Sequence, residues 1–322
     1  MEVLLNIVLI IVGFVLLIKG ADFLVNGASS LAKRFNVSDI AIGLTVVAMG
    51  TSAPELVVNI IAGTESTDVV FGNIIGSNIF NIFLILGVSS IIYPLTVQRN
   101  ALWKEIPYSL FATIIFFILV NDVLFFGGEE NSLSVVDGIV LLVMFVIFLG
   151  YIFLNLQRNP DAAEVEDIEI HGSLKTTSMI LFGIAGLVFG GRMIVDNAVT
   201  IAESFGVSKK LIGLTILAAG TSLPELATSA VAAFQKKSDL AVGNIVGSNI
   251  FNLLLVLGTT SLIHAPLSYN AVLNTDLFLV MVGTFLLFIF MFTLNKYKLD
   301  RAEGAVYLIG FAVYMYYLFI RM

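Results

Sequence analysis

The sequence contains no cysteine and only two histidines. Without cysteine, the chain has no disulfide bridge, no thiol redox chemistry and no thiolate metal site. The HExxH metal motif, the GxxxxGK[ST] phosphate loop and the GxSxG nucleophile motif are also missing. These absences argue against a zinc protease, a P-loop nucleotide hydrolase and a serine hydrolase. We expect neither an enzyme nor a resident cofactor.

Charge is also scarce. Charged residues make up 12% of the chain and hydrophobic residues 58%, whereas roughly a quarter of an ordinary soluble domain is charged. So few polar groups cannot form a water-facing surface, so lipid must surround most of the exterior. The net charge of −7 arises partly from one acidic stretch, 161–169, and nothing indicates nucleic-acid binding. We expect a multi-pass protein of a cell membrane, with the lipid bilayer as partner and no obligate protein partner.

Long apolar runs account for most of the chain. A helix of roughly 20 residues crosses the ~30 Å hydrocarbon core of a bilayer. Ten runs reach that length: 3–27, 39–62, 69–92, 105–126, 135–155, 177–202, 211–234, 240–263, 272–294 and 302–320. The sequence therefore predicts an all-α integral membrane protein with ten transmembrane helices.

Basic residues are distributed unevenly between the two ends of these spans. Cytoplasmic loops of membrane proteins carry an excess of Lys and Arg. With the N-terminus outside, the cytoplasmic side receives Lys33, Arg34, Arg99, Lys104, Arg158, Lys175, Lys236, Lys237, Lys296, Lys298 and Arg301. The outer side then keeps only Lys209, Lys210 and Arg321. Both termini are thus predicted outside, and the 156–176 loop is predicted in the cytoplasm.

Two long segments of the sequence occur twice. Residues 43–59, GLTVVAMGTSAPELVVN, return at 213–229 as GLTILAAGTSLPELATS. Residues 72–87, GNIIGSNIFNIFLILG, return at 243–258 as GNIVGSNIFNLLLVLG. Two long matches in the same order and spacing indicate an internal duplication of the chain.

The duplication also predicts how the halves are oriented. Each half contains five predicted crossings, and an odd number makes the second half enter the membrane from the opposite side. We therefore predict two inverted five-helix repeats, 1–157 and 175–322, joined by an acidic cytoplasmic linker at 158–174. Many secondary transporters have this architecture, and their substrate site lies at the interface between the repeats.

The first duplicated segment gathers oxygen ligands on one helix face. Steps of three and four residues bring together Ala48, Thr51, Ser52 and Glu55 in the first copy. The second copy repeats the set as Ala218, Thr221, Ser222 and Glu225. Pro54 removes a backbone donor and loosens the helix near Gly50, which frees carbonyl oxygens, and Pro224 does the same in the second copy. Such a set of hard oxygens suits Na⁺ or Ca²⁺ better than a soft metal.

A glutamate in the middle of a membrane is costly and usually functional. A Glu that a neighbouring helix satisfies, without a transport role, is the plainer alternative, and duplication at equivalent positions argues against it. We predict that Glu55 and Glu225 meet at the membrane midplane and share a cation. Helix hydroxyls often bond back to a carbonyl, but Ser52 and Ser222 are predicted to bind ions.

The second duplicated segment adds neutral oxygens. It places Ser77, Asn78 and Asn81 on one face, and its second copy does the same with Ser248, Asn249 and Asn252. The glycines of this segment allow helices to approach closely. We predict Asn81 and Asn252 as cation ligands. Asn78 and Asn249 either bind the ion or hold the broken backbone together.

These motifs carry a family resemblance that covers nearly the whole chain. With GTSAPE and GSNIFN in one half and GTSLPE and GSNIFN in the other, the sequence resembles the sodium/calcium exchangers of the cation/calcium antiporter superfamily, in their prokaryotic ten-helix form. The resemblance implies that Glu55 and Glu225 bind Ca²⁺ and contribute to Na⁺ sites, with Asn81 and Asn252 lining the centre. It implies Na⁺ sites completed by the side chains of Thr51, Ser52, Thr221, Ser222, Ser77 and Ser248 and by the carbonyls of Ala48 and Ala218.

The resemblance further implies that the first and sixth helices slide as a gate across a static remainder. Many family members carry Asp at the position of Asn252, so the predicted site has two acidic residues rather than three. Two carboxylates balance one Ca²⁺, and three Na⁺ on the same pair leave one positive charge. We therefore expect electrogenic exchange of Na⁺ for Ca²⁺ by alternating access.

Three alternatives remain at this point. A proton- or potassium-coupled exchanger of the same fold is the first, and the Thr-Ser pair kept in both repeats favours Na⁺ over protons. A channel is the second, and inverted repeats with broken helices favour alternating access instead. The third is an intramembrane hydrolase that uses the two Glu as acid and base. It lacks a metal-binding His or a nucleophile–base set.

Overall fold

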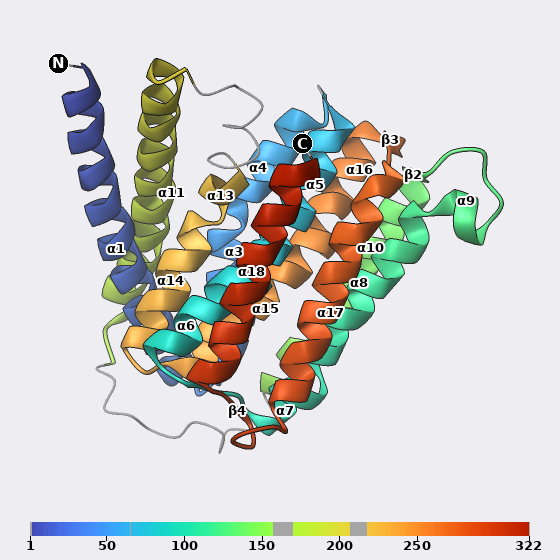
Figure 1. The fold of residues 1–322 in the computed structure, drawn as a ribbon. Coiled ribbons are helices and arrows are strands. Elements are labelled where there is room, and N and C mark those ends of the chain that lie inside the picture. The colour runs from blue at the N-terminus through green and yellow to red at the C-terminus, as the bar shows by residue number, and fades with distance from the viewer. Residues whose placement is uncertain (1, 65, 157–169, 207–217, 322) are drawn as a thin grey trace.

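The structure is a computed structural model that describes residues 2–64, 66–156, 170–206 and 218–321. Most of the long helices run between the top and the bottom of Figure 1. Eight described helices are long and apolar enough to cross a membrane, and a ninth crossing is a bent pair, Asp39–Thr51 with Ala53–Ala62. The predicted all-helical membrane architecture is therefore confirmed. The one predicted span that remains, 211–234, begins outside the described residues. Most of the predicted acidic linker also lies outside them.

The elements of each half follow the same order. The first half contains α1 (Glu2–Phe35), α2 (Asp39–Ile42), the π-helix η1 (Gly43–Val47), α3 (Ala48–Thr51), α4 (Ala53–Ala62), α5 (Thr67–Ile79), the π-helix η2 (Phe80–Ile85), α6 (Leu86–Ile92), β1 (Leu95–Thr96), α7 (Arg99–Trp103), α8 (Glu105–Val120), α9 (Asp122–Phe125), β2 (Ser132–Leu133) and α10 (Val135–Leu156). The second half contains α11 (Ser173–Ser204), α13 (Ala218–Thr221), α14 (Leu223–Phe234), α15 (Ser238–Ile250), the π-helix η5 (Phe251–Val256), α16 (Leu257–His264), β3 (Leu267–Ser268), the 3₁₀-helix η6 (Ala271–Leu273), α17 (Asn274–Phe290), β4 (Lys298–Leu299) and α18 (Arg301–Arg321).

Two predicted spans extend too far at their C-terminal ends. The span predicted over 105–126 ends as α8 at Val120, and the one predicted over 272–294 ends as α17 at Phe290. At the first end, Asn121 leaves the helical conformation with φ −110° and ψ 58°. Its side-chain amide donates to the carbonyl of Phe117 at 2.8 Å and so takes over a helix-end acceptor. Hydrophobic side chains continue beyond both ends, which is why composition alone placed the boundaries too late.

Short strands connect the two halves in a symmetric way. β1 of the first half pairs with β4 of the second, and β2 of the first pairs with β3 of the second, both antiparallel. β1 and β3 follow prolines, Pro94 and Pro266, which stand seven and eight residues after the ends of the duplicated segments. The β4 end lies at the bottom of Figure 1, whereas β2 and β3 lie at the top. Equivalent strands at opposite ends are what inverted repeats require.

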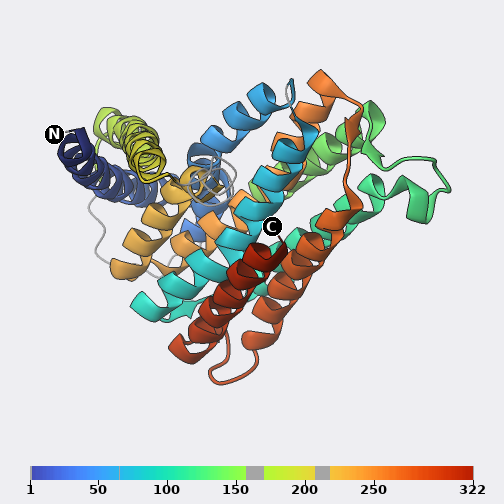
Figure 2. The same cartoon turned by 45° about the horizontal axis from the view of Figure 1, so that its top comes forward.

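The helices α1 and α11 form a pair at one edge of the molecule, which is clear in both ribbon views (Figure 2). Glycines line their contact. A Cβ added to Gly20 would lie 2.7 Å from the backbone nitrogen of Leu187, and one added to Gly183 would lie 2.6 Å from that of Leu24. No side chain fits there, so the two backbones touch, as in other membrane helix pairs built on small residues.

The duplicated segments meet in the centre of the molecule. All residues of α15 except Asp239 are buried, and its glycines pack against the first repeat. A Cβ on Gly243 would lie 2.6 Å from the carbonyl oxygen of Ile40, and one on Gly43 would lie 2.9 Å from that of Leu240. The outer helices show the opposite pattern, because α10 and α18 expose large apolar side chains such as Val146 and Phe319. Lipid is the environment that suits such a surface.

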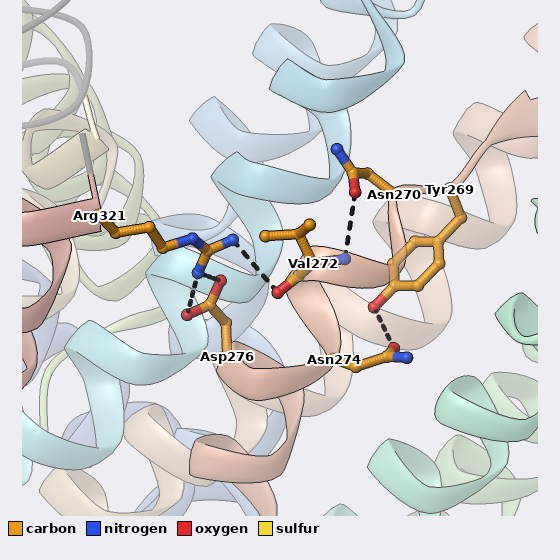
Figure 3. Close-up of polar contacts among 6 residues, drawn as sticks. All are labelled: Tyr269, Asn270, Val272, Asn274, Asp276 and Arg321. Carbon is orange, nitrogen blue, oxygen red and sulfur yellow. Dashed lines mark hydrogen bonds and ion pairs between the residues drawn. The ribbon is translucent and has the colours of Figure 1, made fainter.

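An ion pair fastens the last helix to α17 (Figure 3). The guanidinium of Arg321 lies 3.0 Å from the carboxylate of Asp276. It also donates to the carbonyl oxygen of Val272 at 3.2 Å. Beside this contact, the hydroxyl of Tyr269 donates to the side-chain oxygen of Asn274 at 2.9 Å. Because Arg321 neutralises Asp276, this buried acidic residue already has its partner.

Candidate cation-binding site

The site begins with two helix breaks. The segments before and after Ser52 are bent by 43° relative to each other, and Ser52 itself has φ −85° and ψ 3°. The equivalent Ser222 has φ −89° and ψ 4°. Pro54 lacks the N–H that would otherwise bond to the carbonyl of Gly50. The sequence predicted this loosening near Gly50, and the bend lies two residues further on, at Ser52.

Each break places a glutamate in the first turn of a new helix. Glu55 lies in the first turn of α4 and Glu225 in the first turn of α14, where the helix dipole favours negative charge. Both side chains are 0% exposed. The two carboxylates come from opposite repeats. Ser52, three residues before Glu55, donates to Glu225 at 3.2 Å, so the helix break of the first repeat contacts the glutamate of the second.

The two glutamates differ in their hydrogen bonds. Oε1 of Glu225 accepts from the hydroxyl of Ser52 at 3.2 Å and lies 3.5 Å from the hydroxyl of Ser248. Its other oxygen and both oxygens of Glu55 have no hydrogen-bond partner among the described residues. A buried carboxylate without hydrogen bonds or a counter-charge is strongly unfavourable. These oxygens therefore require a cation or a proton.

Two asparagines supply further oxygens. Asn81 lies in the π-helix η2 and Asn252 in the equivalent η5, and both are 0% exposed. The amide nitrogen of each is held, by Asn249 at 2.9 Å and by Asn78 at 3.2 Å respectively. Their side-chain oxygens have no partner. Sequence analysis did not foresee the π-helices, although such segments frequently occur at functional sites.

The hydroxyl groups fall into two kinds. Those of Ser77 and Ser222 are buried and have no partner. Those of the threonines are bonded across the repeat interface: Thr51 donates to Asn244 at 3.1 Å, and Thr221 donates to Asn73 at 3.3 Å. Thr51 also lies 3.3 Å from the hydroxyl of Ser248. The structure thus brings the predicted serines and threonines of both repeats to one interface.

Two backbone carbonyls, those of Ala48 and Ala218, are predicted as ligands. The structure gives hydrogen bonds for the first and the helix position of the second. The carbonyl oxygen of Ala48 accepts from the N–H of Ser52 at 2.9 Å and from the hydroxyl of Thr51 at 3.3 Å. Ala218 is the first residue of α13. Both residues therefore stand one turn before the helix break of their repeat.

Sequence reasoning missed two asparagines that support the threonines. Asn73 accepts from Thr221 and donates to Asn59 at 2.7 Å, and Asn244 accepts from Thr51 and donates to Ser229 at 3.0 Å. A signal for them exists, because each stands four residues before a site serine in the duplicated segment. That spacing puts them on the same helix face as Ser77 and Ser248.

The donor set contains oxygen only. Within the described part of the chain, the buried side-chain oxygens that lack a hydrogen-bond partner include Glu55 Oε1 and Oε2, Glu225 Oε2, Asn81 Oδ1, Asn252 Oδ1, Ser77 Oγ and Ser222 Oγ. No group of three or more His, Cys, Asp or Glu that could hold a metal ion occurs among the residues described. Carboxylate, amide and hydroxyl oxygens suit the hard cations Na⁺ and Ca²⁺ and disfavour soft transition metals.

The two sides of the site differ in accessibility. Gly72, Asn73 and Gly76 of α5 are half-buried, and so is Thr221. The equivalent residues of the other repeat, Gly243, Asn244, Gly247 and Thr51, are all buried. The α15 residues are covered by α2 and η1 of the first repeat, whereas the stretch of the second repeat equivalent to α2 and η1 lies outside the described residues.

The fold and this interface define a membrane transporter built from inverted repeats, with buried oxygen atoms between them. A family model described as sodium/calcium exchanger protein matches residues 5–154 and 175–320. The chain is 37% identical to CaxA of Alkalimonas amylolytica, a match that covers 90% of this chain and 91% of CaxA. It is 31% identical to the sodium/calcium exchanger MaX1 of Methanosarcina acetivorans, with 98% of both chains covered.

Solved structures agree with the sequence comparison. A structure of the sodium-calcium exchanger NCX_Mj, soaked with Na⁺ and Ca²⁺, is similar to this chain with a TM-score of 0.82 and 31% identity over 97% of each chain. The chain belongs to the sodium/calcium exchanger family. It is therefore a transporter and not an enzyme, and the resemblance noted in the sequence is confirmed.

Proposed function

We propose that the protein is an antiporter that exchanges Na⁺ for Ca²⁺ by alternating access. The observation that carries the proposal is the pair of fully buried glutamates from opposite repeats, surrounded by buried oxygens that lack partners. A cation supplies what these oxygens lack. The relative MaX1, named a sodium/calcium exchanger, and the NCX_Mj structure soaked with Na⁺ and Ca²⁺ support the choice of ions.

Charge balance explains how the two ions would compete. One Ca²⁺ neutralises Glu55 and Glu225, whereas three Na⁺ leave one positive charge in excess. Both ions use the same oxygens, so full occupancy by one excludes the other. We assign Ca²⁺ to the two glutamates with Asn81 and Asn252. The Na⁺ positions would add Thr51, Ser52, Thr221, Ser222, Ser77 and Ser248 and the carbonyls of Ala48 and Ala218.

Alternating access would use the inverted symmetry of the chain. Exchanging the conformations of the two repeats would move the opening of the site from one side of the membrane to the other. The α1–α11 pair touches through backbone at its glycines, and we assign it the role of a sliding gate. Bare carboxylates are poorly stabilised in an occluded cavity. Only a loaded site would therefore switch, which prevents leak.

We also propose the topology read from the basic residues. The two repeats comprise 1–157 and 175–322, with the linker 158–174 in the cytoplasm and both termini outside.

The test is Ca²⁺ uptake into proteoliposomes under an outward Na⁺ gradient. Glu55→Gln and Glu225→Gln each remove one of the two charges that balance Ca²⁺, so we expect uptake of radiolabelled Ca²⁺ to fall to the level of protein-free vesicles. Glu303→Gln is the control, because Glu303 is also buried but lies at the start of α18, outside the site. Near-normal uptake by both site variants would refute the assignment.

A further inference from the structure

Asn78 and Asn249 lie among the site residues, but their side-chain oxygens already have partners. Oδ1 of Asn249 accepts from the amide of Asn81 at 2.9 Å, and Oδ1 of Asn78 accepts from the amide of Asn252 at 3.2 Å. All four side chains are 0–3% exposed. Each bond crosses from one repeat to the other. The nearest asparagine in sequence, three residues away, is not the partner in either case.

An asparagine amide has two chemically opposite ends of nearly equal shape. One end is an oxygen that accepts, and the other is an NH₂ group that only donates. A cation is attracted by the oxygen and repelled by the NH₂ group. The direction of the amides at positions 81 and 252 therefore decides whether each of them binds a cation or opposes it.

The structure shows what sets that direction. The amide nitrogen of Asn78 donates to the backbone carbonyl of Asn249 at 3.3 Å. A backbone carbonyl can only accept, so it fixes the NH₂ end of Asn78 and turns the oxygen of Asn78 towards Asn252. That oxygen in turn holds the NH₂ end of Asn252, and the Oδ1 of Asn252 is left without a protein partner.

From this arrangement we propose that Asn78 and Asn249 are positioning residues for the cation site. Asn78 orients Asn252 and Asn249 orients Asn81, each across the repeat interface, so that both free amide oxygens face the ion. The inference rests on the proposed function, because it assumes that a cation binds between the repeats. It resolves the two roles that the sequence left open for these residues, since neither uses its side-chain oxygen as a free ligand.

The crossed pairing predicts how the effects of two substitutions on Ca²⁺ binding combine, and a merely structural role makes no such prediction. If Asn78 acts through Asn252, then removing Asn78 has no further effect once Asn252 is gone. Asn78 and Asn81 belong to different pairs, so the losses of Ca²⁺ binding free energy caused by substituting each of them are expected to add. Double-mutant cycles measure this difference directly.

The experiment is equilibrium dialysis of purified protein against radiolabelled Ca²⁺ in Na⁺-free buffer. We expect Asn78→Ala and Asn252→Ala each to weaken Ca²⁺ binding about tenfold, the order of a lost hydrogen bond or ligand to a charged group. The double variant should bind no more weakly than the weaker single one. The control cycle, Asn78→Ala with Asn81→Ala, should instead show multiplied losses. Multiplied losses in the 78/252 cycle, or coupling that appears only in the 78/81 cycle, would overturn the proposal.

A second variant covers the case in which Asn78→Ala does not fold. Asn78→Ser keeps an oxygen that can accept from Asn252, so we expect folded protein with an affinity closer to that of the native chain. Folded Asn78→Ser protein that binds Ca²⁺ as weakly as Asn252→Ala would also contradict the proposal. If the native chain itself fails to bind Ca²⁺, the proposed function is wrong, and that result is separate from any outcome of the cycles.

Discussion

Glu55 and Glu225 occupy equivalent positions in the two repeats, yet the hydrogen bonds around their carboxylates differ. Ser52 donates to Glu225 at 3.2 Å. Among the described residues, the equivalent hydroxyl of Ser222 is buried without a partner, and neither oxygen of Glu55 has a donor within hydrogen-bond geometry. The carboxylate of Glu225 is thus partly satisfied by the first repeat, and that of Glu55 lacks the equivalent contact.

This difference predicts unequal effects of two matched serine variants. In ion-free detergent solution, Ser52→Ala removes a hydrogen bond to a carboxylate and should lower the free energy of unfolding by about 1–2 kcal/mol. Ser222→Ala removes a buried hydroxyl that has no partner, so it should leave stability unchanged or raise it slightly. Denaturation followed by circular dichroism measures both. Equal losses in the two variants would show that the asymmetry is not a property of the ion-free protein.

At the residue scale, the sequence was most informative about side chains whose burial in a membrane costs free energy. A mid-membrane glutamate at two equivalent positions has few explanations besides ion binding, so Glu55 and Glu225 could be singled out. Asn73 and Asn244 have only a weak signal, their spacing of four residues before Ser77 and Ser248, because an amide in an apolar helix can equally well bond to a neighbouring helix. The direction of the amide at Asn78 depends on a carbonyl of the other repeat, which no local pattern contains.

At the scale of the elements, local chemistry explains the helix breaks but not the widened turns. Pro54 and Pro224 both follow the bend by two residues, as the missing N–H requires. The π-helices η2 and η5 contain Asn81 and Asn252 but no proline or other breaker. Their sequences read as ordinary apolar helix. The widened turns depend on packing between the repeats and could not be foreseen.

The close contact of α1 with α11 leads to a prediction at this scale. A Cβ on Gly20 would lie 2.7 Å from the backbone nitrogen of Leu187 and 2.8 Å from the carbonyl oxygen of Gly183. Neither backbone can move without separating the helices. Gly20→Ala should therefore destabilise the protein by on the order of 1–3 kcal/mol, the usual cost of overpacking.

Gly150 offers a matched control for this substitution. It lies in α10, is exposed, and no described residue stands within 4 Å of a Cβ placed on it. Gly150→Ala should leave stability unchanged or raise it by up to about 1 kcal/mol, because alanine favours helix over glycine. Thermal denaturation of the two variants side by side makes the comparison. A Gly20→Ala protein as stable as Gly150→Ala would mean that α1 and α11 are not held in backbone contact.

At the scale of the whole molecule, the architecture followed from the sequence and the conformational state did not. Apolar spans, a duplicated pair of segments and an odd number of crossings together specify inverted repeats. The conformational state cannot be read in this way, because equivalent positions of the two repeats, such as Gly72 and Gly243, hold the same residue in the same motif. Identical motifs cannot by themselves encode which side of the site is open.

The charge of the site belongs to this scale as well, because it determines what crosses the membrane. Two carboxylates and neutral oxygens carry a charge of −2, which matches one Ca²⁺ and leaves an excess of +1 with three Na⁺. Each turnover that brings Ca²⁺ in would then move one net positive charge out. Membrane potential should therefore act on the transport rate, and an inside-positive potential should accelerate Ca²⁺ uptake.

The most direct measurement is Ca²⁺ flux into proteoliposomes under separate outward gradients of Na⁺, K⁺ and H⁺, with the membrane potential set independently. We predict that the Na⁺ gradient alone drives uptake of radiolabelled Ca²⁺, and that an inside-positive potential accelerates it. Uptake that follows the proton or potassium gradient and is indifferent to Na⁺ would contradict sodium-coupled exchange at the paired glutamates.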